Sequence, residues 1–179
     1  NETGYFVKKL VDWNMINGSN GASYRDYPWP QVRLADLYLM YAEALNETLA
    51  SPTSEVSEYL DKIRIRAGLP TVQIAWTNFS NNPGKISSKN GMREIIQQER
   101  LIEMAFEGSR FWDIRRWKRA AEMLNQSITG WSVYQPTTSE YYRVRTIFNQ
   151  NFVAPRDYLW PLRTYDLTVN PKLVQNPGW

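Results

Sequence analysis

Residues 92–124, MREIIQQERLIEMAFEGSRFWDIRRWKRAAEML, contain two helical patterns that meet at Gly108. Gly108 can end the first helix in the left-handed conformation, and the hydroxyl of Ser109 can cap the second. The stretch therefore predicts two helices joined by a tight turn. In the first helix, five residues recur at steps of four, three, four and three and share one row: Met92, Ile96, Glu99, Glu103 and Phe106.

Two carboxylates in this otherwise apolar row predict that cations lie close to them. An unpaired buried carboxylate costs several kcal/mol of free energy, and the nearby arginines are the expected partners. We therefore expect the loss of Glu103 or of Arg110 to destabilise the fold by about 3 to 5 kcal/mol. The expected structural ion-pair network consists of Glu99, Glu103, Glu107, Arg100, Arg110, Asp113 and Arg116.

The repeated glutamates also allow a second interpretation, because glycoside hydrolases use paired carboxylates as acid and base. A general acid at neutral pH needs a raised pKa, whereas arginine neighbours lower the pKa of a carboxyl group. We therefore favour the structural interpretation, and we expect neither a catalytic residue nor an enzymatic activity.

The composition excludes several kinds of site. The 179 residues include no Cys and no His, so thiol nucleophiles, Ser-His-Asp triads and Cys/His zinc sites are excluded. Neither a glycine-rich phosphate loop nor calcium-loop spacing is present, so we expect no cofactor and no metal. The net charge is +3, but basic and acidic residues alternate, so nucleic acid is not an expected partner. No apolar run is long enough to cross a bilayer.

The rest of the chain predicts a mainly α fold in a single domain, residues 1–179. Apolar residues at helical spacing predict a helical hairpin over about 31–68, and the stretch above predicts a second over about 91–124. A polar loop is expected at 71–90, and a short strand at residues 5–7. Aromatic and β-branched segments predict a β/irregular segment over 130–179, with a short β-hairpin and an irregular C-terminal tail. The two helical hairpins are expected to stack as tetratricopeptide-like pairs.

Four segments resemble the carboxy-terminal part of the SusD/RagB family. They are RLADLYLMYAEALNE at 33–47, IRIRAGLP at 63–70, ERLIEMAFEGSRFWDIRRW at 99–117 and NPKLVQNPGW at 170–179. The chain departs from the family pattern at Leu162 and Arg163, and at Asp166. The resemblance implies the C-terminal portion of a lipoprotein on the extracellular face of the outer membrane. It also implies an N-terminal lipid anchor outside this piece, and delivery of glycans to a SusC-like TonB-dependent transporter.

Glycan-binding residues are expected in the aromatic and polar loop that precedes the first helical hairpin. A sugar presents C–H faces that pack on aromatic rings, and hydroxyls that need amide or charged partners. The expected contacts are Trp13, Asn17, Tyr24, Arg25, Tyr27 and Trp29. Trp76 with Asn78 and Asn82, and Trp131 with Tyr134, are lesser candidates. Aromatic residues more often serve packing, and the alternative role of Tyr27 and Trp29 is to seal the start of the following helix.

The leading hypothesis is therefore an oligosaccharide- or polysaccharide-binding protein for glycan import. The alternative is a helical-repeat scaffold that recognises a protein partner, and a carboxylate-based hydrolase is the third reading of the sequence. Exposed aromatics in a loop-rimmed pocket favour the first, and aromatics along a concave helical surface favour the second.

Overall fold

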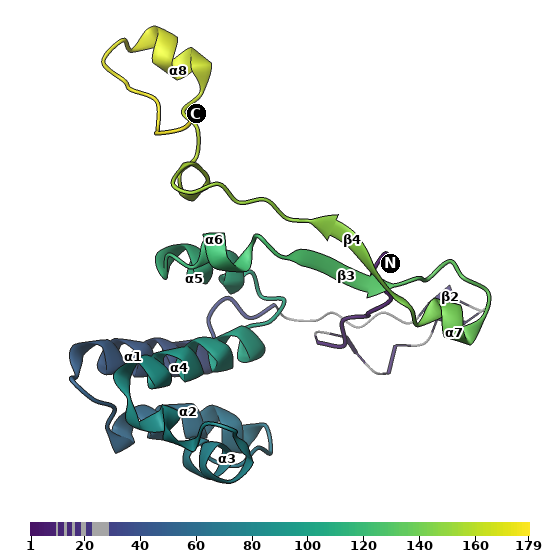
Figure 1. Ribbon diagram of the computed structural model, residues 1–179, viewed down its shortest axis with the longest axis vertical. Coiled ribbons are helices and arrows are strands. Elements are labelled where there is room, and N and C mark those ends of the chain that lie inside the picture. The colour runs from purple at the N-terminus through teal and green to yellow at the C-terminus, as the bar shows by residue number, and fades with distance from the viewer. Residues whose placement is uncertain (10, 13, 16, 19–20, 23–28) are drawn as a thin grey trace. The chain divides into compact units, whose positions relative to one another are not determined.

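The computed structural model describes residues 1–9, 11–12, 14–15, 17–18, 21–22 and 29–179 (Figure 1). Contacts divide the chain into two compact units. The helical unit comprises residues 16–110, and the hairpin unit comprises residues 1–15 and 111–179. Each unit has a buried apolar cluster of its own.

The helical unit contains four α-helices in its described part. They are α1 (Leu34–Thr48), α2 (Ser54–Arg66), α3 (Val72–Phe79) and α4 (Lys89–Glu103), with the 3-10 helix η1 (Pro83–Ser87) before α4. Two short strands, β1 (Asn17–Gly18) and β2 (Gly21–Ala22), pair antiparallel ahead of α1. No helix in the described part of the chain is long and apolar enough to cross a membrane.

The core of the helical unit lies where α1 packs against both α2 and α4 (Figure 1). Its helices bury residues at helical spacing, so each contributes one apolar stripe to the core. The buried side chains are Leu39, Ala42, Val56, Leu60, Ile63, Val72, Met92, Ile95, Ile96 and Met104. The helix pair predicted over 31–68 is thus α1 and α2.

The prediction of a polar loop at 71–90 is wrong, because this stretch forms α3 and η1. The Thr71 hydroxyl caps α3 by accepting a hydrogen bond from the backbone N–H of Ile74 at 3.3 Å. Val72 is fully buried, and Trp76 packs against the core. The apolar stripe of α3 was hidden in the sequence by the polar residues that surround it.

The turn after α4 differs from the prediction that the helix continues to Gly108. The helix ends at Glu103, and both Phe106 and Gly108 have positive φ angles, of 64° and 83°. Phe106 is therefore outside the row that begins at Met92, and its side chain is 66% exposed. The second predicted helix is also interrupted: α5 (Ser109–Arg116) and α6 (Ala120–Met123) are separated by Lys118, with a φ of 58°.

The hairpin unit is built on two antiparallel strands, β3 (Ser127–Trp131) and β4 (Val144–Asn149), which pair with a bulge between Ile128 and Thr129. The short helix α7 (Thr138–Tyr141) lies in their connection. The N-terminal segment packs on β3, since the Trp131 N–H donates to the Thr3 carbonyl at 3.0 Å. Residues 5–7 form no strand, contrary to expectation.

The C-terminal tail contains the 3-10 helix η2 (Arg156–Tyr158) and the short helix α8 (Thr164–Val169). It folds back on itself through the Gln175 side chain, which bonds both the N–H and the carbonyl of Leu162, at 2.8 and 3.0 Å. The predicted class is confirmed: the described part of the chain is mainly helical, with two small two-stranded antiparallel sheets and a largely irregular tail.

Candidate functional site

An arginine-glutamate cluster lies at the C-terminal end of α4. The Arg33 guanidinium binds Glu107 through two hydrogen bonds, Nε to Oε2 and Nη2 to Oε1, each of 2.8 Å. Its Nη1 donates to Oε1 of Glu103, also at 2.8 Å. Arg66, at the end of α2, donates to both oxygens of Glu103, at 2.8 and 2.7 Å. The cluster therefore ties the start of α1 and the end of α2 to the end of α4.

Most of the charged groups of this cluster are buried, and they are paired with one another. The side chains of Arg33, Glu103 and Glu107 are only 19%, 13% and 9% exposed. Burial by itself lowers the pKa of Arg33, but the hydrogen bonds and negative charges of Glu107 and Glu103 outweigh it and raise that pKa above its ordinary value. Arg33 therefore stays charged.

Two further ion pairs join the helices of this unit. Glu99 pairs with Arg64 of α2, whose Nε also donates to the Pro70 carbonyl at 2.7 Å. Arg100, which is buried, pairs with Asp36 of α1. The sequence analysis missed four partners, Arg33, Asp36, Arg64 and Arg66. All four lie in the segments 33–47 and 63–70 that carry the family resemblance.

The other members of the expected network lie on α5. Asp113 is buried, and its Oδ1 accepts a hydrogen bond of 3.0 Å from Nε of Arg116. Asp113 and Arg116 belong to the hairpin unit, whereas the glutamates belong to the helical unit. Arg110 is half-buried at the start of α5. Glu103 has Arg33 and Arg66 as partners, and neither lies near it in the sequence.

A small pocket of about 190 Å³ opens beside the cluster, lined by Arg33, Leu34, Ala35, Tyr38, Lys62, Ile63 and Arg66. The Lys62 ammonium lies 4.0 Å from the ring centre of Tyr59 and pairs with Glu58 at 3.1 Å. The cations of this pocket are thus engaged by carboxylates of the same unit. Both oxygens of Glu103 and of Glu107 likewise accept hydrogen bonds from arginine, so neither carboxylate is arranged to serve as an acid or a base.

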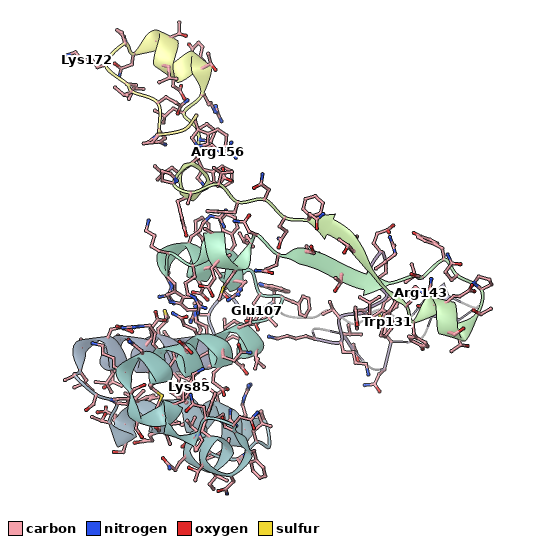
Figure 2. The ribbon with its side chains drawn as sticks, in the orientation of Figure 1. Lys85, Glu107, Trp131, Arg143, Arg156 and Lys172 are labelled. Atoms are coloured by element: carbon pink, nitrogen blue, oxygen red, sulfur yellow. The ribbon has the colours of Figure 1, made fainter. Side chains whose placement is uncertain are left out.

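A second pocket, which we name the tip pocket, lies in the hairpin unit, in the segment that connects β3 to β4. It has a volume of about 260 Å³ and is lined by Gln135, Pro136, Thr137, Thr138, Tyr141 and Tyr142. Trp131, one of the lesser candidates from the sequence, lies directly behind it: its ring centre is 4.9 Å from that of Tyr142. Figure 2 labels Trp131 and Arg143 at this end of the hairpin. Tyr134 is exposed and donates a hydrogen bond of 2.9 Å to Glu2.

The aromatic loop expected to bind glycan is described only in part. Trp13, Tyr24, Arg25 and Tyr27 lie outside the described residues. Asn17 belongs to β1, and Trp29 is 53% exposed just before α1.

The remaining candidates differ in exposure. Trp76 is half-buried against the helical core with Lys85 over its ring, whereas Asn78 and Asn82 are exposed. Among the described residues, no group of three or more acidic side chains is arranged to hold a metal ion.

A family model described as the SusD family matches residues 1–179. The chain belongs to the SusD family. Among SusD-like relatives, it is 34% identical over 174 residues to SusD-like protein P2 of Formosa agariphila, covering 97% of this chain and 30% of that protein. SusD-like protein P38 of the same organism is 32% identical over 146 residues, covering 80% of this chain and 23% of that protein. The chain therefore spans less than a third of the length of these relatives.

Solved structures share the SusD-like fold. The selenomethionine form of BT4246 superposes with a TM-score of 0.71 at 29% identity, covering 89% of this chain and 26% of that one. A SusD-like carbohydrate binding protein of Bacteroides fragilis, BF0978, superposes with a TM-score of 0.61 at 30% identity, covering 79% of this chain and 28% of that one.

Proposed function

We propose that the chain is the C-terminal portion of a glycan-binding protein that delivers oligosaccharide to a SusC-like TonB-dependent transporter in the outer membrane. The observation that carries the proposal is the match of the SusD family model to all 179 residues. A structural neighbour with 30% identity is described as a carbohydrate binding protein, which supports a carbohydrate as the ligand class. The proposed location is the extracellular face of the outer membrane, through a lipid anchor on the complete protein.

A binding role without chemistry agrees with the state of the carboxylates. Glycoside hydrolysis needs two carboxyl groups that can reach the glycosidic bond and a water or sugar carbon. Glu103 and Glu107 instead each accept hydrogen bonds from arginine at both carboxylate oxygens. We therefore assign a structural role to the network of Glu99, Glu103, Glu107, Arg100, Arg110, Asp113 and Arg116, and extend it to Arg33, Arg64 and Arg66.

The loop before α1 remains part of the proposal as a glycan-binding surface. Its proposed contacts are Trp13, Asn17, Tyr24, Arg25, Tyr27 and Trp29. The exposed half of the Trp29 side chain leaves aromatic surface available for the C–H face of a sugar.

A binding panel with the complete protein tests the proposed function. Affinity electrophoresis against neutral and acidic polysaccharides is expected to retard the protein on at least one of them, and a reducing-end assay on the same polysaccharide is expected to show no release. Release of reducing ends at a catalytic rate would instead support the hydrolase alternative. Co-purification with a TonB-dependent transporter after mild detergent extraction tests delivery, and its absence under conditions that preserve glycan binding would remove that part of the proposal.

A further inference from the structure

We propose that the tip pocket is a glycan subsite that holds one uncharged pyranose ring. This inference rests on the proposed function and adds to it a second contact region, in the hairpin unit, with a defined class of sugar. Residues 135–142 carry the subsite, a stretch separate from the aromatic loop that precedes α1.

The size of the tip pocket fits a single sugar unit. Its volume is about 260 Å³. This is below the range of about 300 to 1,000 Å³ that is typical of drug-sized ligands, so an oligosaccharide would place only one ring inside. The pocket is open to solvent, which lets the neighbouring rings of a longer chain extend outward.

Aromatic surface is available in the pocket for the C–H face of a sugar. The rings of Tyr141 and Tyr142 meet at 76°, with their centres 5.1 Å apart, so they form two walls of a corner. Tyr142 is 55% exposed, and Pro136 adds apolar surface to the lining. A pyranose ring presents its axial hydrogens to such a wall, and the burial of this apolar area favours binding.

Polar groups in the lining are free to bind sugar hydroxyls. Within the described residues, no hydrogen bond engages the side-chain amide of Gln135 or the hydroxyls of Thr138, Tyr141 and Tyr142. The amide offers both donors and an acceptor, and each hydroxyl offers one donor and accepts as well. A sugar hydroxyl has the same dual character, so these groups match it better than they match a ligand that only accepts.

The lining of the tip pocket carries no charge, and it therefore favours an uncharged sugar ring. None of the six lining residues carries a charge at neutral pH. The adjacent Glu140 is bound by the Thr137 hydroxyl at 2.6 Å, and Arg143 is not part of the lining. A carboxylate or sulfate inside this pocket would lose hydration without gaining a cation, which is unfavourable.

The walls of the pocket are held in place by contacts within the hairpin unit. The Trp131 ring packs against both tyrosines, with its centre 4.9 Å from that of Tyr142 and 6.2 Å from that of Tyr141. The ring centre of Tyr5 lies 4.5 Å from that of Trp131. The backbone is held by the Ser132 N–H, which donates to the carbonyls of Tyr141 and Arg143 at 2.9 and 3.1 Å. Little ordering is therefore required on binding, and binding is correspondingly less costly.

Calorimetric titration of the complete protein tests the subsite. The probes are maltohexaose, cellohexaose, xylohexaose and laminarihexaose as neutral glycans, oligogalacturonate as an acidic one, and decaproline as a peptide. We expect Tyr142→Ala to raise the Kd for the best neutral probe about five- to tenfold, and Gln135→Ala to raise it about three- to fivefold. The matched control is Tyr165→Ala, which removes a 74% exposed tyrosine of α8 outside the pocket and is expected to leave the Kd unchanged.

The outcomes separate the subsite from the proposed function. If wild type, Gln135→Ala and Tyr142→Ala all bind a neutral probe with the same Kd, the subsite is overturned and the proposed function stands. A wild-type protein that binds none of the glycans overturns both. Preference for oligogalacturonate that depends on Tyr142, or binding of decaproline in place of glycan, overturns the uncharged-sugar assignment. Because Tyr142 packs on Trp131, Gln135→Ala decides the outcome if Tyr142→Ala lowers the melting temperature.

Discussion

Arg33 and Glu107 form a two-pronged ion pair across 74 residues of sequence, with both N···O distances at 2.8 Å. The same guanidinium also reaches Glu103, so one arginine at the start of α1 fixes two carboxylates at the end of α4. The planar guanidinium suits this arrangement, because its donors point in the directions that a carboxylate accepts.

Replacing Arg33 by alanine is expected to destabilise the helical unit by about 3 to 5 kcal/mol, since Glu107 loses both hydrogen bonds from Arg33 and Glu103, which keeps Arg66, loses one of its arginine partners. Arg33→Lys is expected to recover only part of this loss, because an ammonium cannot form the two-pronged pair. Urea unfolding measures both. Glu58→Ala, which breaks the exposed pair with Lys62, is the control and is expected to change the unfolding midpoint very little. Equal midpoints for Arg33→Ala and wild type would contradict the structural role.

Acid sensitivity is expected from the pair of Glu47 and Arg93, which joins α1 to α4. The Arg93 hydrogen bonds hold the pKa of Glu47 below its ordinary value, although burial acts in the opposite direction. A folded-state pKa that lies below the unfolded one contributes stability above the unfolded pKa of about 4.3, and this stability is lost as the pH falls through the folded pKa. Melting temperatures of wild type and Glu47→Gln are therefore expected to differ at pH 7 and to converge toward pH 3. A difference in melting temperature that stays constant from pH 7 to pH 3 would show that the titration of Glu47 does not contribute to stability.

Gly91→Ala is expected to destabilise the protein, although the same change in a helix usually stabilises by about 1 kcal/mol. A Cβ at position 91 would lie 2.0 Å from the backbone carbonyl oxygen of Lys85, so η1 and α4 must separate. The expected cost is about 1 to 3 kcal/mol or more, as for other overpacked sites. Gly84→Ala is the matched control, because its Cβ would meet nothing closer than 4.0 Å. Thermal unfolding of both variants measures the contrast, and a Gly91→Ala variant as stable as Gly84→Ala would show that the two elements do not pack so closely.

Trp29→Ala is expected to weaken glycan binding about five- to tenfold if the loop before α1 supplies a sugar-stacking ring, which is the range for loss of one aromatic contact. Titration of the best neutral glycan, followed by intrinsic Trp fluorescence, measures it. Because Trp29 is 53% exposed, the substitution is not expected to lower the melting temperature substantially. An unchanged affinity would leave Trp29 with a packing role only. This conclusion does not depend on whether the tip pocket binds sugar.

Local patterns predicted the helices well where an apolar stripe was long and regular. The spacing of Leu34, Leu37, Tyr38, Tyr41, Ala42 and Leu45 predicted α1, and Gly68 with Pro70 marked the end of α2. The short helix α3 was missed because its stripe is short and the surrounding residues are polar. The ends of α4 and α5 were placed too far along the chain, since positive φ angles at Phe106 and Lys118 are not recognisable from residue type.

The sequence alone determined the mainly helical class, the positions of the long helices, the hairpin and the family, because these depend on local periodicity and on motifs within short segments. Tertiary structure decided which cations meet the glutamates of α4. Arg33, Arg64 and Arg66 lie between 35 and 74 residues from their partners, and only the packing of α1 and α2 against the rest of the helical unit brings them close. It also decided that six neutral residues of the connection between β3 and β4 line a pocket, because Trp131 packs against its tyrosines and the N-terminal residue Tyr5 packs against Trp131.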